Sequence, residues 1–273
     1  MKKLIIFTDL DGTLLDYSTY SFEAALPALK MLKGKNIPLI ICSSKTRKEI
    51  EYYRKKLGNN HPFISENGGG IFIPKEYVGF NVRNLSDEKS EDDYQIISLG
   101  AKYSALRSAI EELKKEGLNV KGFGDMSIEE VVEIAGVTHE EAEMAKERDF
   151  DEPFIFEGSE EKTRRLFNSI KSKGFNYTQG RFFHILGNSD KGKAVSILID
   201  LYKRKFAEIV TIAIGDSPND ITMLEKVEYP VIVQKPDGRY DPQINIPNLI
   251  KADGIGPEGW NKAVLNLIFS NIG

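Results

Sequence analysis

The chain has 273 residues, of which 41% are hydrophobic and 29% charged, so we expect a soluble globular protein with one large or two modest domains. Its formal net charge of −4 argues against a general nucleic-acid binder, which would present a basic face. The single cysteine, Cys42, excludes an intramolecular disulfide. No stretch approaches the roughly 18 apolar residues that cross a bilayer. We therefore expect no membrane association and a cytoplasmic location.

Short apolar runs alternate with amphipathic runs at both ends of the chain. In chain order, these runs predict strand 4–8, helix 22–32, strand 38–42, helix 47–57, strand 209–214, a helix from 219 to 225, strand 230–233 and helix 258–269. Buried strands that alternate with helices are typical of a parallel sheet covered on both faces. We therefore expect an α/β core domain with a Rossmann-like parallel sheet, built from residues 1–83 and 188–273.

The middle of the chain has a different pattern. Gly68-Gly69-Gly70, followed by an apolar run over 71–73, predicts a hairpin. The later segments predict helices 103–115, 128–135 and 139–146, and strands 154–156, 175–178 and 182–186, which we expect to be antiparallel. This composition predicts an inserted α+β cap domain over residues 84–187. The polar stretches 84–93 and 187–190 are its expected linkers.

Two acidic clusters follow buried strands. Asp9 and Asp11 come after the first strand, and Asp216 and Asp220 come after strand 209–214. Each cluster alone could simply cap the next element. However, ligands of open parallel sheets bind beyond the carboxyl ends of the strands, so the clusters would meet there if their strands are neighbours. Converging carboxylates need a counter-charge, and Mg²⁺ suits carboxylate and phosphate oxygens, whereas the few Cys and His residues lack zinc-ligand spacing.

Two further segments suit a phosphate group. Ser43 and Ser44 follow strand 38–42 and offer hydroxyl and backbone N–H groups to an anion, although Ser43 alone could be a helix cap. Lys191 opens a helix after the inserted domain. Its ammonium can neutralise both a carboxylate and a phosphoryl group, although a lone lysine is more often solvated.

Together these motifs resemble the haloacid dehalogenase superfamily of phosphatases. The resemblance rests on Asp9-Leu10-Asp11-Gly12-Thr13, the strand-terminal serine, the downstream lysine and Gly215-Asp216-Ser217-Pro218-Asn219-Asp220, in that order. The position of the insert, after Ser65-Glu66-Asn67-Gly68, resembles the branch with a large α/β cap.

The resemblance implies a role for each motif residue. Asp9 would be the nucleophile that attacks phosphorus, and Asp11 would protonate the leaving oxygen and then deprotonate water. Mg²⁺ would be held by Asp9, the carbonyl of Asp11 and Asp216. Lys191 would neutralise charge at Asp9, and Asp220 would orient Lys191 or a water on the ion.

Charged groups stand among aromatic residues in two segments of the insert, 148–154 and 180–185. Arg148 and Arg181 could each clamp a carboxylate, whereas Glu152 and His184 could bind sugar hydroxyls. Without the motifs, the same residues would be interpreted as salt bridges at strand ends and a satisfied core histidine.

Both segments also resemble the mannosyl-3-phosphoglycerate phosphatase family, as do Ser43-Ser44-Lys45-Thr46, Ser65-Glu66-Asn67-Gly68-Gly69 and His184-Ile185-Leu186-Gly187. That family hydrolyses 2-O-mannosyl-3-phosphoglycerate to mannosylglycerate, a compatible solute, and relatives act on the glucosyl analogue. The resemblance therefore implies a small-molecule sugar phosphate as substrate.

Three alternatives remain open at this point: a phosphatase for another sugar phosphate, such as a sucrose-phosphatase-like enzyme, a phosphomannomutase-like enzyme, and a catalytically silent sugar-phosphate sensor. The sensor is disfavoured because the aspartates and the lysine of all motifs are kept. The sequence leaves the oligomeric state, the preferred divalent ion and the extent of cap motion undetermined.

Overall fold

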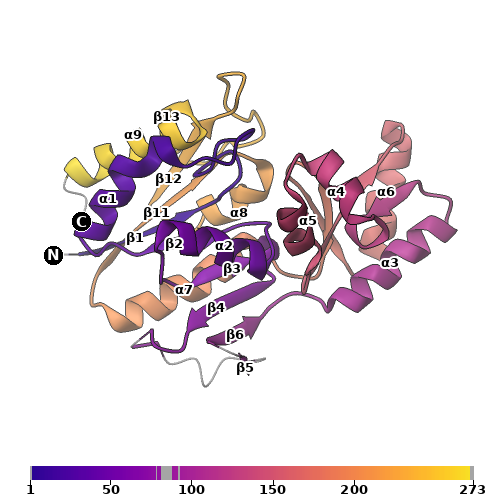
Figure 1. The fold of residues 1–273 in the computed structure, drawn as a ribbon, viewed down its shortest axis with the longest axis horizontal. Helices are drawn as coiled ribbons and strands as arrows, with labels where there is room; N and C mark the ends of the chain where they lie inside the picture. The colour runs from indigo at the N-terminus through magenta and orange to yellow at the C-terminus, as the bar shows by residue number, and fades with distance from the viewer. Residues whose placement is uncertain (1, 78, 81–87, 92, 271–273) are drawn as a thin grey trace.

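The computed structural model describes residues 2–77, 79–80, 88–91 and 93–270. Within these residues the chain forms two sheets, each with its own helices (Figure 1). The strands of the larger sheet are β1 Lys3–Thr8, β2 Leu39–Cys42, β3 Phe63–Ser65, β4 Gly70–Pro74, β5 Glu88–Glu91, β6 Tyr94–Ser98, β11 Ile209–Gly215, β12 Tyr229–Gln234 and β13 Ile250–Ile255. Its helices are α1 Leu26–Gly34, α2 Arg47–Leu57, α7 Lys191–Lys205, α8 Ile221–Leu224 and α9 Gly256–Phe269.

The larger sheet has the order β13-β12-β11-β1-β2-β3-β4-β6-β5. Its strands from β13 to β3 are parallel, and those from β3 to β5 are antiparallel. The predicted parallel core built from both ends of the chain is therefore confirmed. Thr8 of β1 lies opposite Ile214 of β11, so the segments that follow these two strands start side by side.

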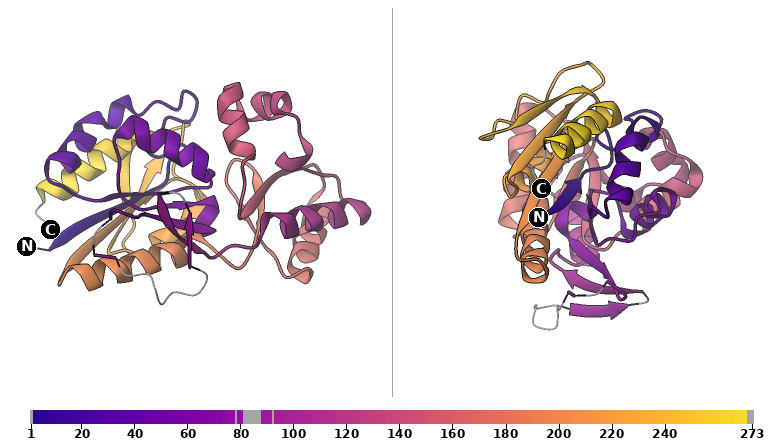
Figure 2. Two further views of the ribbon diagram at one scale, coloured as in Figure 1. Left: turned by 60° about the horizontal axis from the view of Figure 1, so that its bottom comes forward. Right: turned by 90° about the vertical axis from the view of Figure 1, so that its left-hand side faces the viewer.

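Helices cover both faces of the parallel strands (Figure 2). Residues of α1, α2 and α9 share one apolar cluster with one face of the sheet, and residues of α7 and α8 share a second cluster with the other face. Because β1 is buried on both sides, Ile6 joins the first cluster and Phe7 the second. Trp260 of α9 is fully buried and donates its indole N–H to Thr8 Oγ1 at 3.0 Å, which attaches this helix to the end of β1.

The smaller sheet is antiparallel, as predicted, with the order β7-β8-β10-β9. Its strands are β7 Val120–Gly122, β8 Asp151–Phe156, β9 Asn176–Gln179 and β10 Phe183–Leu186, and its helices are α3 Tyr103–Lys115, α4 Ile128–Ala135, α5 His139–Lys146 and α6 Glu160–Ser172. The predictions of α3, α4 and α5 are confirmed, whereas α6 and β7 were not predicted. Capping boxes at Ser127 and Thr138 begin α4 and α5, and Gly136, at φ +65°, ends α4.

One predicted boundary is wrong. The cap was expected to begin at residue 84, but β6 pairs with β4 and β5 pairs with β6, so both strands extend the larger sheet. Of the predicted linker 84–93, residues 84–87 and 92 lie outside the described residues, and 88–91 form β5. We retain the division into a core and an inserted cap as a proposal, with 99–102 and 187–190 as the two crossings. We call residues 103–186 the cap and the remaining residues the core.

Gly68 and Gly69 lie in the turn between β3 and β4 and Gly70 begins β4, and the two strands pair as the predicted hairpin. Their further role is close packing against the cap. A Cβ on Gly69 would lie 2.2 Å from the Cβ of Phe150, and one on Gly100 would lie 2.6 Å from the same atom. Phe150 therefore sits against glycine backbone of the core, where no larger residue fits.

Within the described part of the chain, no helix combines the length and the apolarity that crossing a membrane requires.

We predict that Gly69→Ala lowers the free energy of unfolding by about 1–3 kcal/mol, because the new methyl overlaps Phe150. Gly34→Ala is the matched control, since a Cβ there would meet nothing within 4 Å. Denaturant unfolding of both variants measures the difference. Equal free energies for the two would contradict the close packing at Phe150.

Candidate active site

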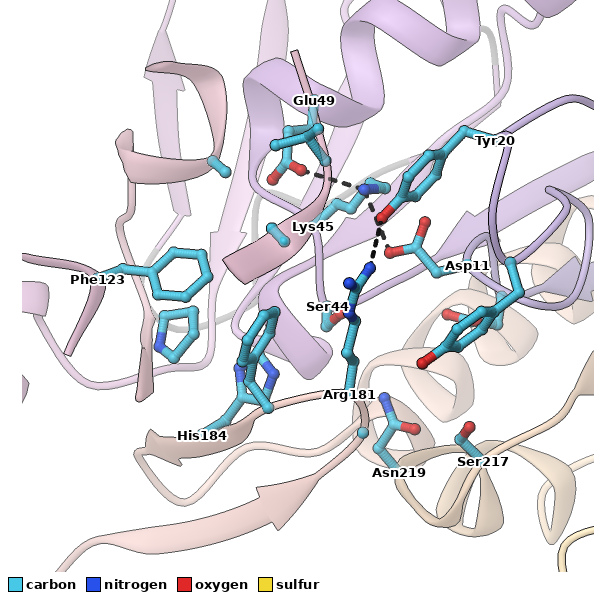
Figure 3. A pocket seen from close by; sticks show the side chains of 18 of the residues that line it. Asp11, Tyr20, Ser44, Lys45, Glu49, Phe123, Arg181, His184, Ser217 and Asn219 are labelled. Carbon is cyan, nitrogen blue, oxygen red and sulfur yellow. Dashed lines mark hydrogen bonds and ion pairs between the residues drawn. The ribbon is translucent and has the colours of Figure 1, made fainter. Parts of the chain in front are cut away.

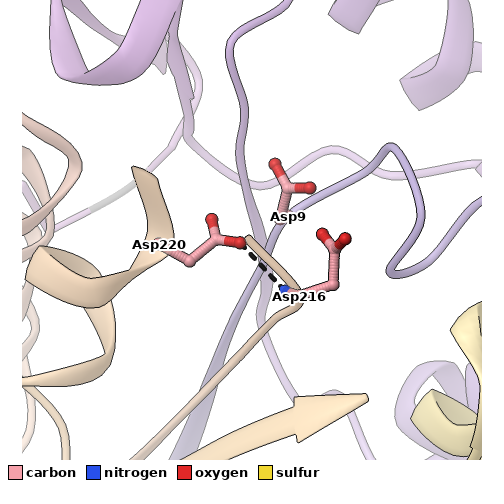
Figure 4. A group of neighbouring side chains, drawn as sticks. All are labelled: Asp9, Asp216 and Asp220. Atoms are coloured by element: carbon pink, nitrogen blue, oxygen red, sulfur yellow. Dashed lines mark hydrogen bonds between the residues drawn. The ribbon is translucent and has the colours of Figure 1, made fainter. Parts of the chain in front are cut away.

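The two acidic clusters meet at the carboxyl ends of β1 and β11. The N–H of Asp9 donates to the carbonyl of Ile214 at 3.0 Å, which ties the first cluster to the strand preceding the second. Carboxylate oxygens of Asp9, Asp216 and Asp220 lie within 4.8 Å of one another, and all three residues are buried (Figure 4). The predicted convergence of acidic groups from opposite ends of the sequence is thus present in the structure.

Lys191 is the cation among these carboxylates. Its ammonium donates to Asp9 Oδ1 and to Asp220 Oδ1, both at 2.7 Å, and the side chain is fully buried. The backbone of Asp190, the residue before Lys191, packs directly against Gly68, where a Cβ would lie 2.1 Å from the Asp190 carbonyl oxygen. Because Gly68 has no side chain, the start of α7 can lie this close and bring Lys191 to the carboxylates. Burial alone lowers the pKa of Lys191, but Asp220 and Asp9 outweigh it and raise that pKa above its usual value. The two carboxylates therefore favour the charged form of Lys191.

Hydrogen bonds fix the orientation of Asp216 and Asp220. Asp216 Oδ1 accepts from Thr13 Oγ1 at 3.1 Å, and Oδ2 accepts from Ser217 Oγ at 2.8 Å. Asp220 Oδ2 accepts the backbone N–H groups of Asp216 and Ser217 at 3.0 and 3.1 Å. Both oxygens of Asp220 are thus engaged, one by Lys191 and one by backbone, which suits a residue that orients its neighbours.

The cluster carries more negative charge than Lys191 neutralises. Burial raises the pKa of Asp9 well above its usual range, and the charges of Asp220 and Asp216 add to that increase against the opposing effect of Lys191. Burial and the charge of Asp220 raise the pKa of Asp216 to about 7. Carboxylates gathered in this way favour a bound cation, and an all-oxygen donor set fits a hard divalent ion such as Mg²⁺.

Asp11 is held by a residue that the sequence reasoning missed. Lys45 Nζ lies 3.2 Å from Asp11 Oδ2 and 3.2 Å from Glu49 Oε1 (Figure 3). Loss of hydration raises the pKa of Asp11, and Lys45 acts in the opposite direction. Within the described residues, the buried Oδ1 of Asp11 has no hydrogen-bond partner. One carboxylate oxygen is therefore fixed by an ammonium while the other is unengaged.

A pocket lies between these core residues and the cap, and both parts of the chain line it. From the core it includes Asp9, Asp11 and Asp216 together with Ser44, whereas Ser43 is fully buried outside its lining. Of the two serines predicted to bind phosphate, only Ser44 therefore faces the pocket. The hydroxyl of Ser43 instead accepts the N–H of Lys45 at 3.3 Å. The alternative interpretation of Ser43 as a helix cap is wrong as well, because Thr46 is the N-cap of α2.

Arg148 and His184 line the pocket from the cap, but both are already paired with Asp151. His184 Nδ1 lies 3.0 Å from Asp151 Oδ2, and Arg148 forms a close ion pair with the same carboxylate. Arg148 also donates to the carbonyl of Ser44 at 3.0 Å, so it joins the cap to the core. These contacts fit the alternative interpretation, in which Arg148 forms a salt bridge and His184 is a satisfied core histidine, although both side chains still line the pocket.

Glu152 is placed differently from the prediction. Its carboxylate is fully buried and does not line the pocket. It accepts from Arg107 Nη1 at 2.7 Å, Tyr103 Oη at 2.8 Å and the N–H of Gly124 at 2.8 Å. The expected contact between Glu152 and a sugar hydroxyl is therefore unsupported. Neighbouring residues of β8 point to opposite faces of the sheet, and Glu152 points to the face that is covered by the interior of the cap.

Arg181 reaches the pocket from the segment between β9 and β10, as expected for a substrate-facing residue. Its guanidinium donates to Tyr20 Oη at 3.1 Å and to the carbonyl of Ile134 at 3.3 Å. Tyr20 and Asn219 also line the pocket and were not predicted. Asn219 belongs to the motif at residues 215–220, which could have identified it as a site residue. By contrast, nothing in the sequence around Tyr20 marks it as a pocket residue.

Comparison with protein families identifies one match that covers most of the chain. The model of the haloacid dehalogenase-like hydrolases matches residues 6–237. A glucosyl-3-phosphoglycerate/mannosyl-3-phosphoglycerate phosphatase of Methanococcoides burtonii is 49% identical over 98% of both chains. A protein of the same name from Persephonella marina is 44% identical over 97% of both chains, and a mannosyl-3-phosphoglycerate phosphatase of Pyrococcus furiosus is 38% identical over 84% of this chain and 90% of its own.

Solved structures share the fold at low sequence identity. A protein of Thermoplasma acidophilum superposes with a TM-score of 0.70 at 18% identity, over 98% of this chain and 99% of its own. A HAD subclass IIB sugar phosphatase superposes with a TM-score of 0.65 at 17% identity, over all of both chains.

Proposed function

Because the chain belongs to the haloacid dehalogenase-like hydrolases, we propose that it removes the phosphoryl group from mannosyl-3-phosphoglycerate, glucosyl-3-phosphoglycerate or both. The observation that carries the proposal is the position of Asp9, whose carboxylate lies beside Lys191 at the floor of a pocket that cap residues complete. It acts as a phosphoric monoester hydrolase, which agrees with the names of its relatives.

We assign the chemical step to Asp9 and Asp11. A carboxylate oxygen of Asp9 attacks phosphorus, the bond from phosphorus to the leaving oxygen breaks, and that oxygen takes a proton from Asp11. Asp11 then removes a proton from water, which attacks the phosphorus of the aspartyl phosphate. The bond from phosphorus to the Asp9 oxygen breaks, which regenerates the Asp9 carboxylate and releases inorganic phosphate. The pairing of Asp11 Oδ2 with Lys45 stabilises the charge that Asp11 carries after it gives up its proton.

Mg²⁺ is the cofactor that we propose. Asp9, the carbonyl of Asp11 and Asp216 would hold it, in keeping with the excess of buried negative charge around them. When bound, the ion supplies positive charge that stabilises the phosphoryl oxygens during transfer. Lys191 neutralises Asp9 from the other side, and Asp220 keeps Lys191 in place through its 2.7 Å hydrogen bond.

Charge pairing within the pocket supports a proposed position for the glycerate carboxylate. Lys45 is paired with Asp11 and Glu49, and Arg148 with Asp151. By contrast, Arg181 has no carboxylate partner within the described residues, and its hydrogen bonds go to neutral oxygens. We therefore assign the substrate carboxylate to Arg181 and the hexose to the neighbouring cap wall near His184.

The cytoplasmic location expected from the sequence stays a prediction, as does the absence of a nucleic-acid partner.

We expect phosphate release from mannosyl- or glucosyl-3-phosphoglycerate to exceed release from mannose 6-phosphate or sucrose 6-phosphate. The reason is that only the first two carry a carboxylate for Arg181. Comparison of kcat/KM for the four compounds under one set of divalent ions tests the assignment. A preference for mannose 6-phosphate, or transfer of phosphate between sugar hydroxyls without net release, would instead favour the mutase-like alternative.

Asp9→Asn should reduce kcat by about three orders of magnitude or more on every substrate, because an amide cannot form the phosphoryl intermediate. Asp237→Asn is the matched control, since this aspartate lies in an exposed loop where it pairs with Arg239. Phosphate release by both variants should be measured with p-nitrophenyl phosphate as well as the glycosyl substrates. Full turnover by Asp9→Asn would exclude the covalent mechanism.

Removal of divalent ions with a chelator should abolish phosphate release, and Mg²⁺ should restore it. The thermal unfolding midpoint should also fall on chelation, because Lys191 pairs with Asp9 and Asp220 and, among the described residues, no cation forms an ion pair with Asp216. Asp216→Asn should reduce the shift in midpoint that Mg²⁺ causes. Activity that persists in excess chelator would argue against a metal at this site.

A further inference from the structure

We propose that Tyr20 is a positioning residue for substrate recognition, whose hydroxyl holds Arg181 of the cap over the pocket so that the guanidinium is ready to bind the substrate carboxylate. This inference rests on the proposed function, because it takes the ligand of Arg181 to be the glycerate carboxylate. It assigns a specificity role to a core loop outside the acidic and phosphate-binding motifs.

Arg181 needs external support to be held in one place. It is exposed at the rim of the pocket and stands in the short connection between β9 and β10, and ordering a long side chain costs rotamer entropy. Two hydrogen bonds hold its fork, one to the carbonyl of Ile134 within the cap and one to Tyr20 Oη in the core. Its guanidinium also lies 5.7 Å from the centre of the Tyr17 ring. Tyr20 is thus its hydrogen-bond partner across the pocket (Figure 3).

The backbone around Tyr20 is shaped to present this side chain. Tyr20 has φ +54°, in the left-handed region that a bulky residue seldom adopts, and such conformations persist where their surroundings hold them. The side chain of Asp16 accepts the N–H groups of Ser18 and Thr19 at 3.0 and 2.8 Å, and the N–H of Tyr20 donates to the carbonyl of Asp16 at 3.0 Å. The loop is therefore closed by its own hydrogen bonds, which fix the place of the ring.

The core side of the ring is fixed as well. The ammonium of Lys45 lies 5.1 Å from the centre of the Tyr20 ring, and the same ammonium pairs with Asp11. One aromatic side chain thus contacts the cation beside the proposed general acid and, through its hydroxyl, the cation proposed for the substrate carboxylate. Burial, followed by the charge of Asp11, raises the pKa of Tyr20, so its hydroxyl stays neutral and accepts from Arg181 without forming an ion pair that would compete with the substrate.

Tyr20→Phe is the direct test, because it removes the hydroxyl and keeps the ring against Lys45. We expect KM for mannosyl-3-phosphoglycerate to rise about three- to tenfold with kcat nearly unchanged. The parameters for p-nitrophenyl phosphate, which has no carboxylate, should stay at the parent values. Tyr52→Phe is the matched control, since its hydroxyl accepts from Lys56 on the outer face of α2.

A double-mutant cycle with Arg181→Ala separates positioning from an independent effect. Arg181→Ala should raise KM for the glycosyl substrate selectively, and Tyr20→Phe should add nothing further in that background. Additive increases, or a Tyr20→Phe effect of equal size on both substrates, would overturn the role of Tyr20. Arg181→Lys gives a second route, because it keeps the charge but loses the fork that contacts Tyr20 and Ile134 together, and it should raise KM in the same selective way.

The cycle also distinguishes this proposal from the proposed function. A selective effect of Arg181→Ala with none from Tyr20→Phe would overturn the role of Tyr20 alone. If Arg181→Ala changes both substrates equally, or if the parent chain releases no phosphate from either glycosyl phosphoglycerate, the carboxylate assignment is withdrawn and the role of Tyr20 with it. Thermal unfolding midpoints of all variants should match the parent, which establishes that the kinetic changes arise in the folded protein.

Discussion

The site depends on one buried ammonium shared by two carboxylates. Lys191 begins the helix that follows the cap, Asp9 directly follows β1 and Asp220 follows β11, so the three groups meet only when both ends of the chain have folded into one sheet. Removing three charges from water is costly, and their close hydrogen bonds offset that cost. The same contacts hold the Asp9 carboxylate where a phosphoryl group can approach it from the pocket.

The excess of buried carboxylates over ammonium groups in the acidic cluster bears on both the stability of the fold and the proposed phosphoryl transfer. With Asp216 added, the buried acids outnumber the single ammonium, and burial moves the pKa of both Asp9 and Asp216 upward. A bound divalent ion would relieve this repulsion and would also supply the charge that phosphoryl transfer needs. Asp220 has the complementary role, since its two oxygens are already used by Lys191 and by backbone N–H groups.

The cap is joined to the core by hydrogen bonds and by close packing between the two parts of the chain. Glu66 of the core accepts the N–H groups of Phe150 and Asp151 at 2.7 and 2.9 Å, and Phe150 rests on the backbone of Gly69. Burial and the charge of Asp151 raise the pKa of Glu66 to about 8. These contacts lie near the two chain crossings, whereas Arg181 meets the core through Tyr20 across the pocket. In the function that we propose, the core residues carry out the chemistry, and recognition depends on how the cap side chains are held against them.

Residue pattern alone was enough to predict the parallel core, because hydrophobic periodicity locates strands and parallel strands present their carboxyl ends at one edge. It predicted the meeting of Asp9 with Asp216 only on the condition that their strands are neighbours, and the pairing of β1 with β11 in the folded sheet decided that condition. Which cap side chains face the pocket depended on the folded chain. Glu152 and its neighbours on β8 alternate between two buried faces, and local pattern does not distinguish them. Lys45 and Tyr20 likewise gained their places from contacts with groups distant in sequence, which no local spacing encodes.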